Sequence, residues 1–83
     1  MKFKAEIDIM PLKELLDPQG KAVTSGLRNI GIQGISDVRI GKHISIELEA
    51  KDEKTANTLV EKACKELLAN PIMESFSLVL KKL

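Results

Sequence analysis

Residues 15–23, Leu15-Leu16-Asp17-Pro18-Gln19-Gly20-Lys21-Ala22-Val23, join a strand pattern to a helix pattern. Asp17 before Pro18 is typical of a helix start, because a carboxylate accepts hydrogen bonds from unpaired amides of the first turn and proline suits the first helical position. Gly20 costs about 1 kcal/mol relative to alanine inside a helix, so helix propensity does not explain its presence. The stretch therefore predicts a strand-to-helix connection in which Gly20 has a further role.

Strand patterns lie on both sides of this stretch. Residues 2–9, 44–50 and 72–80 alternate apolar and polar side chains, which predicts strands with one buried face. Residues 38–40 predict a fourth, short strand, joined to the next by a tight turn at Gly41-Lys42. The last strand is expected at a sheet edge, where little within it prevents pairing with another strand.

Two amphipathic helix patterns separate these strands. The first is expected over Pro18–Ile30, with a left-handed cap at Gly31 and with Gly26 packed close to the sheet. The second begins after Asp52, and Asn70-Pro71 ends it. The order βαββαβ predicts an α+β fold: a two-layer, ferredoxin-like sandwich with a four-stranded antiparallel sheet and both helices on one face.

The 83 residues suffice for one domain, 1–83, which buries only ~60–65% of its unfolded surface. A single cysteine and a single histidine exclude an intrachain disulfide and a closed structural zinc site, so we expect stabilisation by self-association or a partner chain. The lone cysteine and the lack of a signal peptide predict a cytoplasmic setting. No apolar run approaches the ~20 residues of a membrane span, and the net charge of +1 gives no case for nucleic acid or membrane binding.

The titratable residues show no catalytic pattern. His43 is interpreted as a surface turn histidine, because no nucleophile or orienting carboxylate stands at a helpful spacing. Cys64 lies on the apolar stripe of the second helix and is interpreted as a small buried hydrophobe. Glu47 and Glu49 share a face of mixed charge, which indicates solvated cross-strand pairs. The amides at Gln19-Gly20 could hold an anion, but the motif lacks a second glycine at phosphate-loop spacing, so a cap or a chain contact is favoured.

Apolar residues also occur in the connections and on the polar face of the last predicted strand, where a small monomer cannot readily shield them from water. They either cover the edges of the core or belong to protein contacts, and both interpretations stay open. These residues are Leu12, Leu15, Leu16, Ile32, Ile35 and Val79.

Several functions that ferredoxin-like sandwiches support can be excluded. RNA-recognition modules stack bases on sheet aromatics, which this sequence lacks at the required places. Heavy-metal carriers need Cys-x-x-Cys after the first strand, where Ile9-Met10-Pro11-Leu12 stands, and acylphosphatase-like enzymes need an arginine in an anion-binding loop there. A regulatory ligand-binding module or a structural subunit remains.

Three segments together resemble PurS, the small-subunit family of phosphoribosylformylglycinamidine synthase in purine biosynthesis. They are Asp17 to Val23, Val38-Arg39-Ile40-Gly41-Lys42, and Leu67-Leu68-Ala69-Asn70-Pro71-Ile72-Met73-Glu74. The resemblance covers nearly the whole chain. Two departures are the hydrophobic connection from Met10 to Leu16 and Met73, where a β-branched residue is usual.

The resemblance implies a non-catalytic subunit without a cofactor of its own. Its partners would be a glutaminase subunit (PurQ) that frees ammonia, a synthetase subunit (PurL) that uses ATP and magnesium, and further copies of itself in a dimer or tetramer. The alternative is a small-molecule sensor with ligands between protomers near the first helix. The residues expected at chain contacts are Asp17, Gln19, Gly20, Arg39, Gly41, Lys42, Asn70, Pro71 and Glu74.

Overall fold

The computed structural model describes residues 1–13 and 17–83, so the predictions for Leu15 and Leu16 lie outside the described residues. The fold is α+β, with strands, α-helices and one π-helical turn. In chain order the elements are β1 (Lys2–Pro11), α1 (Pro18–Asn29), β2 (Lys42–Glu49), α2 (Glu53–Ala63), the π-helical turn η1 (Cys64–Leu68) and β3 (Glu74–Lys82).

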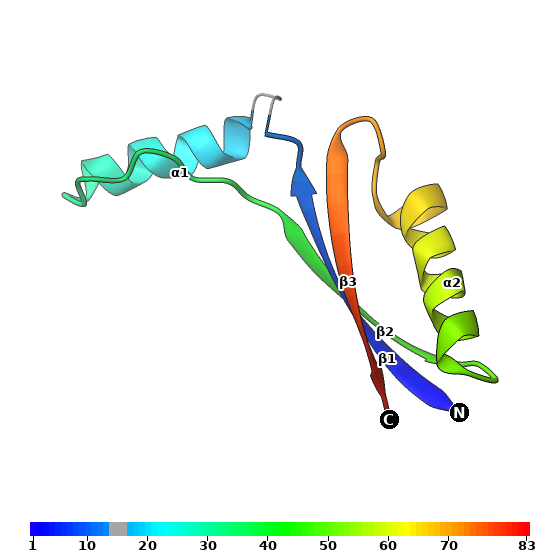
Figure 1. Ribbon diagram of the computed structural model, residues 1–83. Helices are drawn as coiled ribbons and strands as arrows, with labels where there is room; N and C mark the ends of the chain where they lie inside the picture. Colours follow the sequence, from blue (N-terminus) through cyan, green and yellow to red (C-terminus); the bar gives the residue numbers. More distant parts are fainter. Residues whose placement is uncertain (14–16) are drawn as a thin grey trace.

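The strands form an antiparallel sheet in the order β2-β1-β3, with β1 in the centre (Figure 1). Ile7 of β1 lies opposite Ile44 of β2 and Leu78 of β3, so the apolar positions of the strands share one face. The strands predicted from residues 2–9, 44–50 and 72–80 are confirmed, and β3 is an edge strand as predicted.

Helix α2 covers the apolar face of the sheet (Figure 1). Val60 and Cys64, one helical turn apart, are buried against Ile7 and its neighbours on β1. The helix begins as the sequence predicts, because the Asp52 carboxylate accepts a hydrogen bond from the Thr55 amide at 2.7 Å. The core of the protein therefore lies between β1 and α2.

The predicted four-stranded, ferredoxin-like sheet is wrong, because residues 38–40 form no strand and the described sheet has three. The Ile40 amide, which a strand ladder would use, instead donates to the Asp17 carboxylate. Gly31 and Gly34 adopt φ values of 91° and 87°, which interrupts regular structure before this segment. The chain then runs through Gly41 directly into β2, so the predicted tight turn at Gly41-Lys42 is also wrong.

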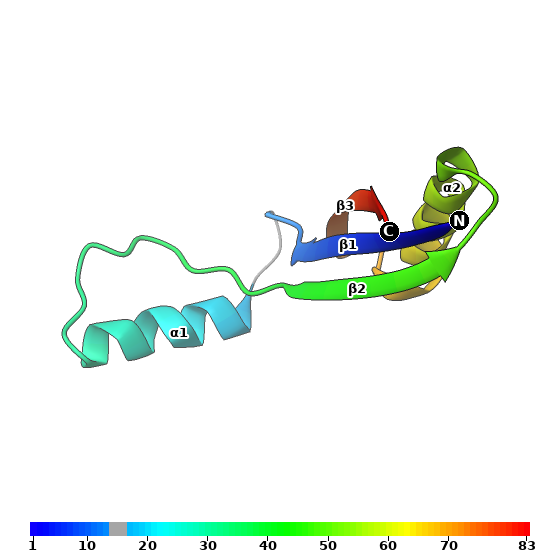
Figure 2. The same cartoon turned by 90° about the horizontal axis from the view of Figure 1, so that it is seen from below.

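The prediction that both helices cover the sheet is wrong for α1. The helix begins at Pro18 and ends one residue before the predicted Ile30, but it projects beyond the end of the sheet (Figures 1 and 2). Ile30 is 72% exposed, and a Cβ built at Gly26 would have no neighbour within 4 Å. The amphipathic pattern of α1 is real, but it does not identify what covers the helix. We call residues 18–37 the arm.

Candidate interaction site

The Asp17 carboxylate joins the start of α1 to the segment that leads into β2. Its Oδ1 accepts a hydrogen bond from the Gly20 amide at 2.9 Å, and its Oδ2 accepts one from the Ile40 amide at 3.0 Å. The hydrogen bond from Gly20, followed by that from Ile40, lowers the pKa of Asp17 because both favour the ionised carboxylate. The predicted helix cap is confirmed, and the same side chain binds a distant backbone segment.

Two glycines allow the backbone segments to touch here. Gly20 is buried, and a Cβ at this position would overlap the carbonyl oxygen of Val38. A Cβ at Gly41 would overlap the Ile9 carbonyl oxygen and the Met10 sulfur. The further role predicted for Gly20 is therefore close backbone packing. We call residues 17–20 and 38–41 together the junction.

The third candidate segment forms a turn between η1 and β3, which we call the 70–74 turn. The Asn70 amide donates to Glu74 Oε1 at 2.8 Å, and Asn70 Oδ1 accepts from the Ile72 amide at 3.0 Å. The Leu12 amide donates to the Met73 carbonyl at 2.9 Å, which fastens the turn to the end of β1. The polar groups of the turn are thus largely satisfied within the chain.

The junction and the 70–74 turn lie at the same end of the sheet. Lys42 at the start of β2 pairs in register with Ile9, and Glu74 at the start of β3 pairs with Pro11. Lys42 Nζ lies 4.0 Å from Glu74 Oε2. The predicted contact residues are therefore brought to one end of the sheet, where Gln19 and Pro71 are exposed and Arg39 is half-buried.

The start of α1 does not resemble an anion site. The Gly20 amide already donates to the Asp17 carboxylate, and that negative charge repels an anion from the same helix end. Of the anion and cap interpretations of Gln19-Gly20, the structure favours the cap, and a contact with another chain stays a prediction.

A cluster around His43 was missed from the sequence. His43 Nδ1 lies 2.6 Å from Asp8 Oδ1, and its Nε2 contacts the Glu6 carboxylate, so the prediction that no orienting carboxylate is near His43 is wrong. The Asp8 hydrogen bond, followed by that from Glu6, raises the pKa of His43. Ser45 donates to Glu6 at 3.2 Å rather than to His43, so the cluster lacks the hydroxyl–imidazole pair of nucleophilic catalysis. Only the pairing register of β1 and β2 could have predicted this cluster, because the residues of each hydrogen-bonded pair are 35 to 39 positions apart in the sequence.

Other chemistry-bearing groups add no active centre within the described part of the chain. Cys64 is buried as predicted, and burial raises the pKa of its thiol. No group of three or more His, Cys, Asp or Glu side chains among the described residues could hold a metal ion. No described helix has both the length and the apolar character needed to cross a bilayer.

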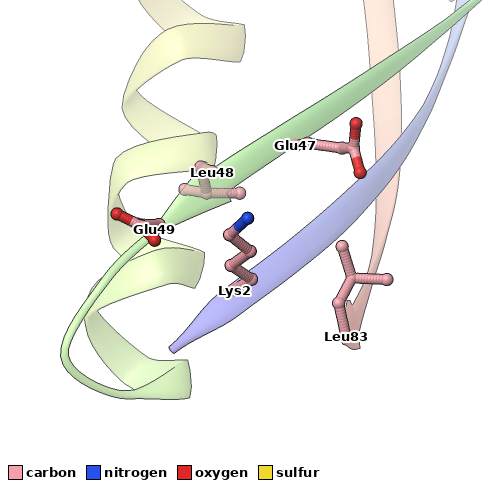
Figure 3. A pocket seen from close by; sticks show the side chains of 5 residues that line it. All are labelled: Lys2, Glu47, Leu48, Glu49 and Leu83. Carbon is pink, nitrogen blue, oxygen red and sulfur yellow. The ribbon is translucent and has the colours of Figure 1, made fainter.

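Figure 3 shows a hollow of about 250 Å³ beside Lys2 and Glu49. These two residues pair at the end of the sheet opposite to Lys42 and the junction. The hollow contains none of the predicted contact residues and no hydroxyl or thiol nucleophile. Its lining residues are Lys2, Glu47, Leu48, Glu49 and Leu83.

Comparison with known proteins decides the family. Residues 4–82 match the PurS family model, described as phosphoribosylformylglycinamidine (FGAM) synthase. The chain belongs to the PurS family. Phosphoribosylformylglycinamidine synthase subunit PurS of Synechocystis is 50% identical over 62 residues, which cover 75% of this chain and 62% of the relative. Its counterpart from Thermotoga maritima is 36% identical over 74 residues, covering 89% of this chain and 90% of the relative.

Solved PurS structures share the whole fold. Bacillus subtilis PurS in its C2 crystal form has a TM-score of 0.85 at 30% identity, covering 96% of this chain and 99% of that one. A chain in the structure of PurLQS from Thermotoga maritima has a TM-score of 0.89 at 33% identity, covering 98% of this chain and 99% of that one. The resemblance to PurS predicted from the sequence is confirmed.

Proposed function

We propose that this PurS chain is the small, non-catalytic subunit of phosphoribosylformylglycinamidine synthase. It would join a glutaminase subunit (PurQ) to a synthetase subunit (PurL) and assist the transfer of ammonia between them. The assembly converts formylglycinamide ribonucleotide and glutamine to formylglycinamidine ribonucleotide and glutamate, and the synthetase subunit uses the ATP and magnesium. The agreement of the whole fold with a chain of PurLQS from Thermotoga maritima carries this proposal.

The side chains of the candidate site support a structural role. The Asp17 carboxylate and the Asn70 and Glu74 side chains bind backbone amides of the same chain. They therefore fix the shape of this end of the molecule. The exposed Gln19 and Pro71 beside them are the residues proposed to contact partners.

Self-association in the cytoplasm, as a dimer or tetramer, is part of the proposal. Three apolar side chains of the arm are exposed, Val23 at 39%, Ile30 at 72% and Ile32 at 43%. Exposed apolar residues that cluster on one projecting element are typical of protein contacts. A small domain with one covered sheet face also gains stability from such contacts.

Reconstitution with purified PurL and PurQ of the same organism tests the proposal. Omitting this chain should abolish product formation from glutamine while leaving product formation from ammonium chloride unchanged. Gly20→Ala should weaken glutamine-dependent turnover through the junction, whereas Lys54→Ala on the exposed surface of α2 serves as the matched control. Equal glutamine-dependent rates with and without the chain would refute the proposal.

The alternative function, a small-molecule sensor, is not favoured because the amide at the start of α1 is occupied by Asp17. A screen of amino acids and nucleotides by thermal denaturation separates the two functions. A sensor would be stabilised by about 3 kcal/mol at a ligand concentration of 100 times Kd, whereas a scaffold subunit would show no such shift.

A further inference from the structure

The open face of the sheet joins β1 to β2 through one histidine. Asp8 and His43 oppose each other in the register of the two strands. At the far end of this ladder the Ala50 amide donates to the Met1 carbonyl at 3.0 Å. Hydrogen-bonded and non-hydrogen-bonded pairs alternate along an antiparallel ladder, so Asp8 and His43 form a non-hydrogen-bonded pair, in which side chains come closest. The register therefore places the imidazole directly against the Asp8 carboxylate.

Both ring nitrogens of His43 face carboxylate oxygens. Nδ1 lies 2.6 Å from Asp8 Oδ1, and Nε2 contacts the Glu6 carboxylate. Lys4 Nζ at 3.3 Å and the Ser45 hydroxyl, which donates at 3.2 Å, favour the ionised form of Glu6. An ionised carboxylate only accepts hydrogen bonds, whereas a neutral imidazole has a single N–H. Two donating nitrogens therefore require the imidazolium, so the geometry identifies His43 as charged in this conformation.

This cluster lies at the end of the ladder that borders the junction. Ile9 and Lys42 form the last pair of β1 with β2, one pair beyond His43. Gly41 of the junction packs so closely against Ile9 that an added Cβ would overlap the Ile9 carbonyl oxygen. Backbone pairing opens most readily at the end of an element. A side-chain bridge one pair from that end therefore restrains both the ladder and the junction.

We propose that His43 is a proton-operated clasp that holds the junction end of β1 and β2 together. The imidazolium bridges Asp8 and Glu6. When the proton on Nδ1 passes to solvent, that nitrogen presents a lone pair to a carboxylate that can only accept, and the contact is lost. Asp8 is the carboxylate released, because its side chain is 68% exposed and water replaces the lost donor, whereas the Glu6 side chain is 25% exposed. The two strands then open more often next to the junction.

The proton that operates the clasp belongs to His43. Besides Glu6 and Asp8, the charged side chains on the open face of the described strands are Lys2, Lys4, Lys81, Glu47 and Glu49. Ser77, which opposes Asp8 on β3, carries no charge. Carboxyl and ammonium groups ordinarily change charge outside pH 5 to 8, whereas histidine changes charge within it. His43 is the single histidine of the sequence, so it supplies the charge change in this range.

An NMR titration of the single histidine ring tests the bridge. In the full chain the ring should titrate above the ordinary pKa of ~6.5, because two carboxylates accept from it. Asp8→Asn and Glu6→Gln should each lower the pKa of His43, since each removes one of these carboxylates. Glu47→Gln removes the same charge from the same face, four residues from His43 along β2, and is the matched control. Equal changes in all three variants, or a change in none, would overturn the proposal.

Amide hydrogen exchange tests whether the clasp restrains the junction. The Ile40 amide, which donates to Asp17 in the junction, is compared with the Ala50 amide at the far end of the ladder. Wild type and His43→Gln are measured at the same pH, so the chemical rate of exchange cancels. At pH 5.5 the Ile40 amide should exchange about two- to fivefold faster in His43→Gln, the range expected for an exposed ion pair, and at pH 9 the two proteins should agree.

The Ala50 amide should exchange equally in both proteins at either pH. Equal exchange of Ile40 at pH 5.5, or an equal acceleration of Ile40 and Ala50, would refute a clasp at the junction. The clasp goes beyond the proposed subunit role and belongs to the chain itself. Both experiments use the full chain without PurL or PurQ, so their failure is distinct from a failed reconstitution.

Discussion

Gly20→Ala tests whether the junction holds the arm in place. In most helices this substitution stabilises, by about 0.5–1 kcal/mol, because alanine restricts the unfolded chain. At Gly20 the added Cβ meets the Val38 carbonyl carbon at 2.9 Å and overlaps its oxygen, so the two backbone segments must separate. Forced overpacking of this kind costs about 1–3 kcal/mol.

Gly26→Ala is the matched control for this variant. It makes the same change in the same helix, where the Cβ has no neighbour within 4 Å. Helix propensity favours alanine in both variants, so a lower stability of Gly20→Ala than of Gly26→Ala reports the contact with Val38. We expect Gly20→Ala to be less stable than Gly26→Ala by about 1–3 kcal/mol.

The arm must be observed directly because it projects from the core. Hydrogen exchange of α1 amides reports the free energy of opening the helix. Circular dichroism during urea denaturation reports the free energy of unfolding of the whole chain. Both variants are compared at one oligomeric state, verified by light scattering. Equal protection of α1 in the two variants would refute the argument that Gly20 is required by close packing.

Three further outcomes follow from the core and the His43 cluster. The pKa of His43 is raised, so its pairing with Asp8 and Glu6 stabilises the folded protein fully below the unfolded pKa of ~6.5. This stabilisation is lost as the pH rises through the folded pKa, so the urea midpoint of unfolding should fall over that range. His43→Gln should reduce this dependence of the midpoint on pH. Val60, 2% exposed, should lose about 2–3 kcal/mol of unfolding free energy as Val60→Ala, measured by urea denaturation. The buried Cys64 thiol, with its raised pKa, should react with a thiol reagent only after urea is added; rapid reaction in the folded protein would contradict its burial.

The sequence predicts the elements of this fold better than their arrangement. Alternation along residues 2–9 and the helix start at Asp52 depend on neighbours in the chain, and both are confirmed. The fourth strand fails because residues 38–40 offer only a short apolar pattern, while the hydrogen bond between Ile40 and Asp17 spans 23 residues. The sequence does not predict the His43 cluster for the same reason, because Asp8 and His43 come together only in the register of β1 and β2.

The junction also accounts for a sequence motif that carries no reaction chemistry. Asp17 is required because one carboxylate caps α1 and accepts the Ile40 amide, and glycine is required at positions 20 and 41 because backbone atoms occupy the space of a side chain. Since α1 projects away from the sheet, these contacts, rather than core packing, set the direction of the arm (Figure 2). Substitutions at Asp17, Gly20 or Gly41 should change the direction of α1 and of its exposed residues while the core between β1 and α2 stays intact. In a subunit proposed to act through contacts alone, a motif of this kind maintains geometry. The Asp17 carboxylate is used within the chain, and exposed neighbours such as Gln19 are left to contact a partner.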